Sequence, residues 1–240
     1  MTRVLPLFAI LVLVLGKSVG AELPRVLVLG DPIQRNLLSA ASRDLKGKAE
    51  VVFPSGAAHD SGSALARIEE LLGEEKWDLI YFNFGLGDLF YKDPRSKEIR
   101  AMSKNAGGVR VSSPEQYHSN LEALVVRLKK TGAQLLWAHT TPMVNVNSFP
   151  GYMGNVYEAN SELAYNKIAK EIMNRHGIPI NDMHAFVMAQ FGPDDKHPGH
   201  NGYQRALSGK RRGKKIDGFE KPPMRQPVVE AILKHLKHLK

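Results

Sequence analysis

Cysteine is absent from this chain of 240 residues. Without a thiol the protein can form no disulfide, has no thiolate nucleophile and cannot build a zinc site on cysteine ligands. The length is sufficient for one domain with a sizeable apolar core. The sequence therefore predicts a single domain stabilised by packing alone, and it excludes cysteine catalysis.

Long apolar runs are scarce as well. The clearest one, residues 4–15, follows a single positive charge at Arg3 and precedes small residues at positions 19 and 21. This pattern is typical of a secretory signal cleaved after residue 21, and an uncleaved anchor is the alternative. The run is shorter than the roughly 20 residues that a membrane-spanning helix needs, and no later segment is apolar enough to cross a bilayer. We therefore expect residues 1–21 to be a signal peptide and the rest to be exported to a bacterial periplasm or medium, with no membrane span.

Acidic residues are few near the carboxyl terminus. Residues 205–240 hold 11 Lys or Arg against three Asp or Glu, whereas the rest of the chain is close to neutral. The basic stretch 210–215 can bind anionic lipid, acidic polysaccharide or nucleic acid, although a solvated loop is the simpler interpretation. For an exported protein we expect a small-molecule or polysaccharide substrate, anionic if this stretch takes part, and no nucleic-acid partner. No feature of the sequence indicates an oligomeric state.

Internal repeats and low-complexity tracts are also absent, and strand and helix patterns alternate instead. We predict strands at residues 25–30, 49–53, 77–84, 134–139 and 178–181, and helices at 35–45, 63–72, 113–130 and 161–176. Residues 90–112 and 143–157 read as irregular excursions. This order predicts an α/β fold, a three-layer, doubly wound and mostly parallel sheet. Residues 22–207 form the domain, and residues 208–240 add a basic loop and a last helix from Pro227 that packs on it.

Polar side chains follow several of these strands. In doubly wound sheets the ligand crevice lies outside the carboxyl ends of the strands, which is where Asp31, Asp88 and His139 fall. In many hydrolases the turn after such a strand presents a serine nucleophile. Here Gly30 and Asp31 are followed by Pro32, which has no hydroxyl.

A second motif lies near the end of the domain. Asp194 and His197 are three residues apart on a turn before a helix. A carboxylate so close can accept the imidazole N–H, fix its tautomer and raise its basicity. A surface turn without chemistry is the alternative.

Taken together, these residues resemble the SGNH (GDSL-like) hydrolase family, in particular a bacterial exported subgroup, over residues 25–207. The segment that carries most of the resemblance is 77–89, Trp-Asp-Leu-Ile-Tyr-Phe-Asn-Phe-Gly-Leu-Gly-Asp-Leu. Further matches are Tyr117, Asn120-Leu121, Thr131-Gly132-Ala133, Trp137-Ala138, Thr140-Thr141-Pro142, Tyr165-Asn166, Ile180-Asn181-Asp182, His197 and Gly202-Tyr203. The resemblance implies an SGNH/flavodoxin-like sheet.

The family's chemistry carries over only in part. The resemblance implies a nucleophilic serine where this chain has Pro32, and an oxyanion-stabilising asparagine where it has Gly87. Gly56 and Gly62 both fit the glycine of the second block. Asp194 and His197 match the family's acid and base. Two catalytic elements are therefore altered, while the base pair is present.

Three hypotheses follow. In the first, a hydrolase of ester or glycosidic bonds uses His197, oriented by Asp194, to activate water, with Asp31 or Asp88 as a second charge or general acid. Asp31 can equally cap the next helix, and Asp88 can brace its loop. The substrate-binding candidates are Asn83, Gly87, His139, Tyr91 and Tyr152.

The second hypothesis is a non-catalytic carbohydrate-binding protein that uses loop aromatics and asparagines. These are Phe90, Tyr91, Phe149, Tyr152 and Tyr157, with Asn145, Asn147 and Asn155. The third is a metal site of His139, His197, His200 and nearby Asp residues. It is weak because no two of these histidines have the i, i+4 spacing of helical ligands. We accordingly expect neither a metal nor another cofactor.

Overall fold

The computed structural model describes residues 22–56, 58–97, 100–142, 156–158, 160–191 and 224–237. Its centre is a five-stranded parallel sheet in the order β2-β1-β3-β6-β7. The strands are β1 (Arg25–Gly30), β2 (Glu50–Val52), β3 (Leu79–Asn83), β6 (Gln134–Ala138) and β7 (Ile180–Asn181). Every residue of β3 is buried, as expected for a central strand covered on both faces. The predicted mostly parallel α/β sheet is confirmed.

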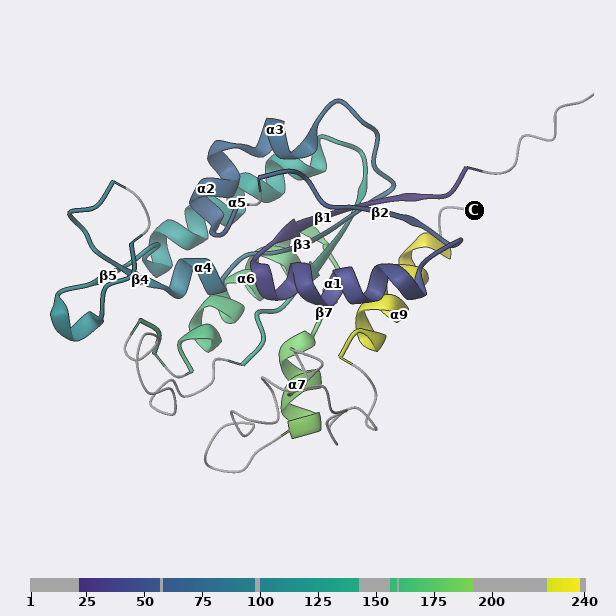
Figure 1. Ribbon diagram of the computed structural model, residues 1–240. Coiled ribbons are helices and arrows are strands. Elements are labelled where there is room, and N and C mark those ends of the chain that lie inside the picture. The colour runs from purple at the N-terminus through teal and green to yellow at the C-terminus, as the bar shows by residue number, and fades with distance from the viewer. Residues whose placement is uncertain are drawn as a thin grey trace, which may run out of the picture.

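Two groups of helices cover the sheet (Figure 1). On one face, α1 (Pro32–Asp44) and α9 (Gln226–Leu236) contact each other and pack with Val28, Tyr81 and Leu136. The other face carries Phe82 and Trp137 and is covered by α2 (Ser61–Ala66), α3 (Ile68–Leu72), α5 (Pro114–Lys129) and α6 (Ser161–His176). The last helix packs on this domain through Val228, Ile232 and Leu236 of α9, which are buried.

The predicted helix over residues 63–72 is wrong in one respect, because it is divided. Helix α2 starts earlier, at a capping box in which the Asp60 side chain accepts from the backbone N–H of Ser63. Arg67, with φ −120° and ψ 17°, separates α2 from α3. Its guanidinium donates to the carbonyl oxygen of Gly56 and to Glu70. The break therefore ties the helix pair to the loop after β2.

Part of the stretch 90–112 is regular, against the prediction of an irregular excursion. It holds an antiparallel pair, β4 (Tyr91–Lys92) with β5 (Val109–Arg110), and a 3₁₀ turn, η1 (Lys104–Ala106). The pair projects from the body on the side away from α9 (Figure 1). Strands of two residues are too short for a sequence period to reveal them.

The segment after β7 forms a helix that the sequence pattern did not predict. Helix α7 (Met183–Phe191) is apolar nearly all round, so no 3.6-residue period marks it. In the parts of the chain that are described, no helix is both long and apolar enough to cross a membrane. The predicted signal peptide and the basic stretch 210–215 lie outside these parts.

Candidate active site

The strand register brings four side chains to one edge of the sheet. Gly30 pairs with Asn83, Phe82 with Trp137, and Ala138 with Asn181, so the strands end at one level. One residue farther along β1, β3, β6 and β7 stand Asp31, Phe84, His139 and Asp182, which we call the edge row. Strand alternation directs all four to the face covered by α2, α3, α5 and α6. The backbones at Asp31 and His139 are separated by two strand spacings of about 4.8 Å each, or about 10 Å in all.

His139 and Asp182 form a hydrogen-bonded pair within this row. The distance between His139 Nδ1 and Asp182 Oδ1 is 3.1 Å. His139 is 6 % exposed, and its other nitrogen, Nε2, is buried without a hydrogen-bond partner among the described residues. The hydrogen bond from His139 is the main cause that lowers the pKa of Asp182 to about 2. At neutral pH a fully ionised carboxylate therefore holds the imidazole by Nδ1 and leaves Nε2 available.

Sequence reasoning placed His139 among substrate-binding residues and missed its partnership with Asp182. Asp182 entered only as part of the family resemblance. The two residues are far apart in the chain, and only the pairing of β6 with β7 brings them together. The one available signal was that His139 ends one predicted strand and Asp182 directly follows another.

Two asparagines fix the backbone next to His139. Asn166 on α6 accepts the Thr140 N–H with Oδ1 at 2.9 Å and donates from Nδ2 to the Thr140 carbonyl at 2.8 Å. Asn83, a predicted substrate-binding residue, donates from Nδ2 to the Ala138 carbonyl at 2.8 Å. In the structure Asn83 therefore stabilises the backbone that carries His139.

Asp31 lies at the opposite end of the edge row and is 2 % exposed. Gly30 before it has φ +153°, and a Cβ there would stand 2.6 Å from the Asn83 carbonyl oxygen, so only glycine fits. Burial, with a contribution from the negative charge of Asp31, raises the pKa of Tyr117 well above its usual value and that of Tyr157 to about 12. The negative charge of Asp31 thus acts on both phenols, and at Tyr117 it adds to the larger contributions of Asp88 and Tyr165.

Asp88, a predicted catalytic residue, is fully buried on α4 (Leu86–Leu89). It accepts hydrogen bonds from the Ser61 hydroxyl and the Ser112 hydroxyl, each at 2.6 Å, and from the Ser61 backbone N–H. Burial outweighs these hydrogen bonds and raises its pKa to about 6. The structure places Asp88 as a brace between α4, the start of α2 and the entry to α5.

Gly87, where the family resemblance implies an oxyanion-stabilising asparagine, has no space for a side chain. A Cβ there would stand 1.8 Å from the carbonyl oxygen of His59 and 3.1 Å from the backbone nitrogen of Asp60. The loop before α2 fills this place with backbone. The glycine is therefore required by the fold of this chain.

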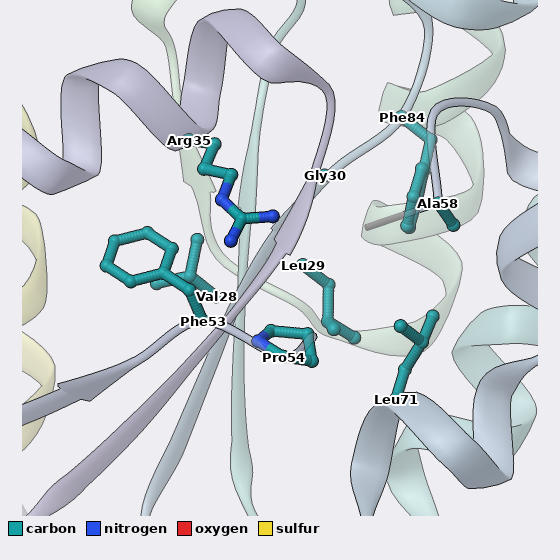
Figure 2. A pocket seen from close by; sticks show the side chains of 9 residues that line it. All are labelled: Val28, Leu29, Gly30, Arg35, Phe53, Pro54, Ala58, Leu71 and Phe84. Atoms are coloured by element: carbon teal, nitrogen blue, oxygen red, sulfur yellow. The ribbon is translucent and has the colours of Figure 1, made fainter. Parts of the chain in front are cut away.

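A small cavity opens beside Gly30, at the ends of β1 and β2. Its volume is about 10 Å³, and apolar side chains that include Leu29, Phe53 and Phe84 line it. Figure 2 shows the side chain of Arg35 reaching from α1 to the cavity next to Phe53. The volume is close to the minimum for one water molecule, so this cavity cannot hold a long acyl chain.

The remaining predicted residues fall elsewhere. Tyr91 is 6 % exposed; its hydroxyl donates to Glu158 at 2.8 Å and accepts from Arg110, so it packs inside the β4–β5 region. Asp194, His197 and Tyr152 lie outside the described residues, as does His200. Within the described ranges no three His, Asp or Glu side chains are grouped to hold a metal ion.

Residues 29–205 match the model of the GDSL-like lipase/acylhydrolase family. The chain belongs to this family. The family resemblance inferred from the motifs is thereby confirmed, while the exported subgroup and the function of position 32 stay predictions. No curated protein matches the sequence.

Solved structures share the GDSL-like fold at low sequence identity. An acetyl xylan esterase is 12 % identical over 87 % of this chain and 99 % of its own, with a TM-score of 0.56. A lipase/acylhydrolase from Enterococcus faecalis is 16 % identical over 88 % and 96 %, with a TM-score of 0.55. A mutant acetyl-xylooligosaccharide esterase from Geobacillus is 14 % identical over 89 % and 94 %, with a TM-score of 0.52.

Proposed function

We propose that this GDSL-like protein hydrolyses esters of carbohydrates that carry a small acyl group, and that water attacks the acyl carbon directly. The observation that carries the proposal is Pro32 at the start of α1, at the position where the family resemblance implies the nucleophilic serine. A seryl ester cannot form there, because proline has no hydroxyl. Hydrolysis in this fold then requires a base that removes a proton from water.

The family resemblance gives the base as His197, oriented by Asp194. Support for a small acyl group comes from two neighbouring structures that are named as esterases of acetylated substrates. Support for a carbohydrate comes from the two neighbouring structures named as esterases of acetylated xylan and xylo-oligosaccharides. We further propose that the protein acts after export, once residues 1–21 have been removed, and that an anionic polysaccharide contacts residues 210–215.

The test is release of acetate from acetylated xylo-oligosaccharides by the purified full chain. We expect His197→Gln to lower the rate by at least about 100-fold, the usual contribution of a general base. Ser39→Ala and Ser55→Ala, both at exposed positions, should leave the rate unchanged. Ser61 and Ser63 are poor controls because their hydroxyls bond Asp88 and Asp60. A protein acylated on serine during turnover would disprove direct attack by water.

The second candidate is a carbohydrate-binding protein without activity. The observation in its favour is Gly87, whose place is closed by the His59 carbonyl and which cannot supply an oxyanion donor from a side chain. Calorimetric binding of the same oligosaccharides, with no acetate released over hours, would identify this function in place of the first.

A further inference from the structure

The pair His139–Asp182 has no role in the family's chemistry as it carries over to this chain. Its Nε2 is buried with no partner among the described residues, although nearly all buried polar atoms in folded proteins have a hydrogen bond. Such an atom at a ligand-binding edge indicates a partner supplied from outside the protein, either a water or a substrate oxygen. The bond from Nδ1 to Asp182 orients the imidazole ring. Asn166 and Asn83 hold the backbone on either side of His139, so the position of Nε2 is fixed.

The charge around the pair favours donation from Nε2. Asp182 is ionised above about pH 2, so a carboxylate lies beside Nδ1 and pairs with the positive charge that the ring carries whenever Nε2 holds a proton. The other charged groups nearby are His184 on α7 and Glu162 on α6, whose closest atoms are 3.3 Å apart. The backbone N–H of Ala185 also donates to Asp182 at 2.9 Å, which fixes the carboxylate at the start of α7. The imidazole of His139 is thus fixed through Nδ1, and its Nε2 lies at the edge row.

We propose that His139 is the general acid that protonates the sugar oxygen as it leaves, and that Asp182 is its positioning residue. This inference rests on the proposed ester hydrolysis. Water forms a bond to the acyl carbon and gives one proton to the water-activating base. The bond between the acyl carbon and the sugar oxygen breaks, and that oxygen takes the proton from His139 Nε2. The proton on the base returns to His139 through solvent, so the products are one carboxylic acid and one sugar hydroxyl.

A comparison of hydrolysis rates on two substrates distinguishes a general acid from a residue that only stabilises the fold. A sugar alkoxide is a strongly basic leaving group and needs a proton, whereas 4-nitrophenolate leaves as a stable anion. We expect His139→Gln to slow acetate release from acetylated xylo-oligosaccharide by about 100-fold or more and to change 4-nitrophenyl acetate hydrolysis less than about threefold. Asp182→Asn should act in the same direction with a smaller effect. Since Asp182 is half-exposed, this second variant disturbs packing little if His139→Gln folds poorly.

His184→Gln is the matched control, because His184 is also near Asp182 but lies on α7 and outside the edge row. It should affect both substrates alike. Equal losses on the two substrates in His139→Gln and Asp182→Asn, or no loss on either, would overturn the inference while leaving the proposed function intact. If the wild-type protein cleaves no sugar ester, the proposed function is wrong and this inference falls with it.

Discussion

The two ends of the edge row differ in how the chain fills them. At the β1–β3 end, Pro32 and Gly87 stand where the family resemblance implies catalytic side chains, and the backbone of His59 occupies the space beside Gly87. At the β6–β7 end, His139 is bonded to Asp182, and Asn83 and Asn166 hold the adjoining backbone. The first end has no side-chain hydroxyl or amide at positions 32 and 87, and the second has a supported polar pair.

The proposed general acid accordingly comes from the β6–β7 end. If proline in place of serine at position 32 were the one difference at the β1–β3 end, the surrounding loops would keep room for the other side chain. The close approach of the His59 carbonyl to Gly87 means instead that the loop before α2 has the shape that suits a missing side chain. The following experiments test how firmly each end is fixed.

The largest effect is expected at Gly87. Gly87→Asn should destabilise the protein by more than about 4 kcal/mol or prevent folding, because its Cβ would overlap the His59 carbonyl oxygen at 1.8 Å. Gly87→Ala should behave similarly. Gly47→Ala is the control: a Cβ there meets nothing within 4 Å, so only its positive φ of +75° opposes the change, and about 1 kcal/mol is expected. Denaturant unfolding measures all three, and a stable Gly87→Asn protein would show that the His59 loop can move.

The carboxyl groups of Asp88 and Asp182 should change the stability of the fold with pH in opposite directions. The pKa of Asp88 is about 6 in the fold and about 3.9 in an unfolded chain. Its contribution to stability is therefore present below about pH 4 and lost as the pH rises through 6. Over that window the unfolding free energy of Asp88→Asn should gain about 3 kcal/mol relative to wild type.

Asp182 provides the comparison at the other end of the row. Its pKa is lowered to about 2 in the fold, so its contribution is present above about pH 4 and is lost as the pH falls through 2. Asp182→Asn should therefore approach wild-type stability in acid. Denaturant unfolding at several pH values measures both variants. The same pH slope for the two would contradict the environments assigned to them.

Asn166 tests the support of the β6–β7 end. Asn166→Ala leaves the buried N–H and carbonyl of Thr140 without their partner, and a loss of about 2 kcal/mol in unfolding free energy is expected. Asn166→Asp keeps the acceptor for the Thr140 N–H but sets a buried carboxylate oxygen against the Thr140 carbonyl oxygen, so at neutral pH its loss should be at least as large. Asn105→Ala, at an exposed position, is the control. Equal stability of Asn166→Ala and wild type would show that the turn is held by other contacts.

The sequence was a good guide to elements that have a clear period and a poor one to contacts between them. The strand 25–30 and the helix that begins at Pro114 follow from buried runs and a capping Ser113. The break at Arg67 and the all-apolar α7 carry no such pattern. Neither the pairing of His139 with Asp182 nor the closeness of His59 to Gly87 could be predicted, because each depends on register and loop path.

The smallest effect is expected from Pro32→Ser. The new hydroxyl would follow Asp31 at the start of α1, as the family's nucleophile does, yet Gly87 still supplies no side chain for the oxyanion. Loss of one oxyanion donor typically costs about 10²–10³ in rate. We therefore expect the rate on 4-nitrophenyl acetate to stay within about tenfold of wild type. A much larger gain, abolished by a serine-directed fluorophosphonate, would mean that the β1–β3 end keeps a working oxyanion site built from backbone and that only the nucleophile was lost.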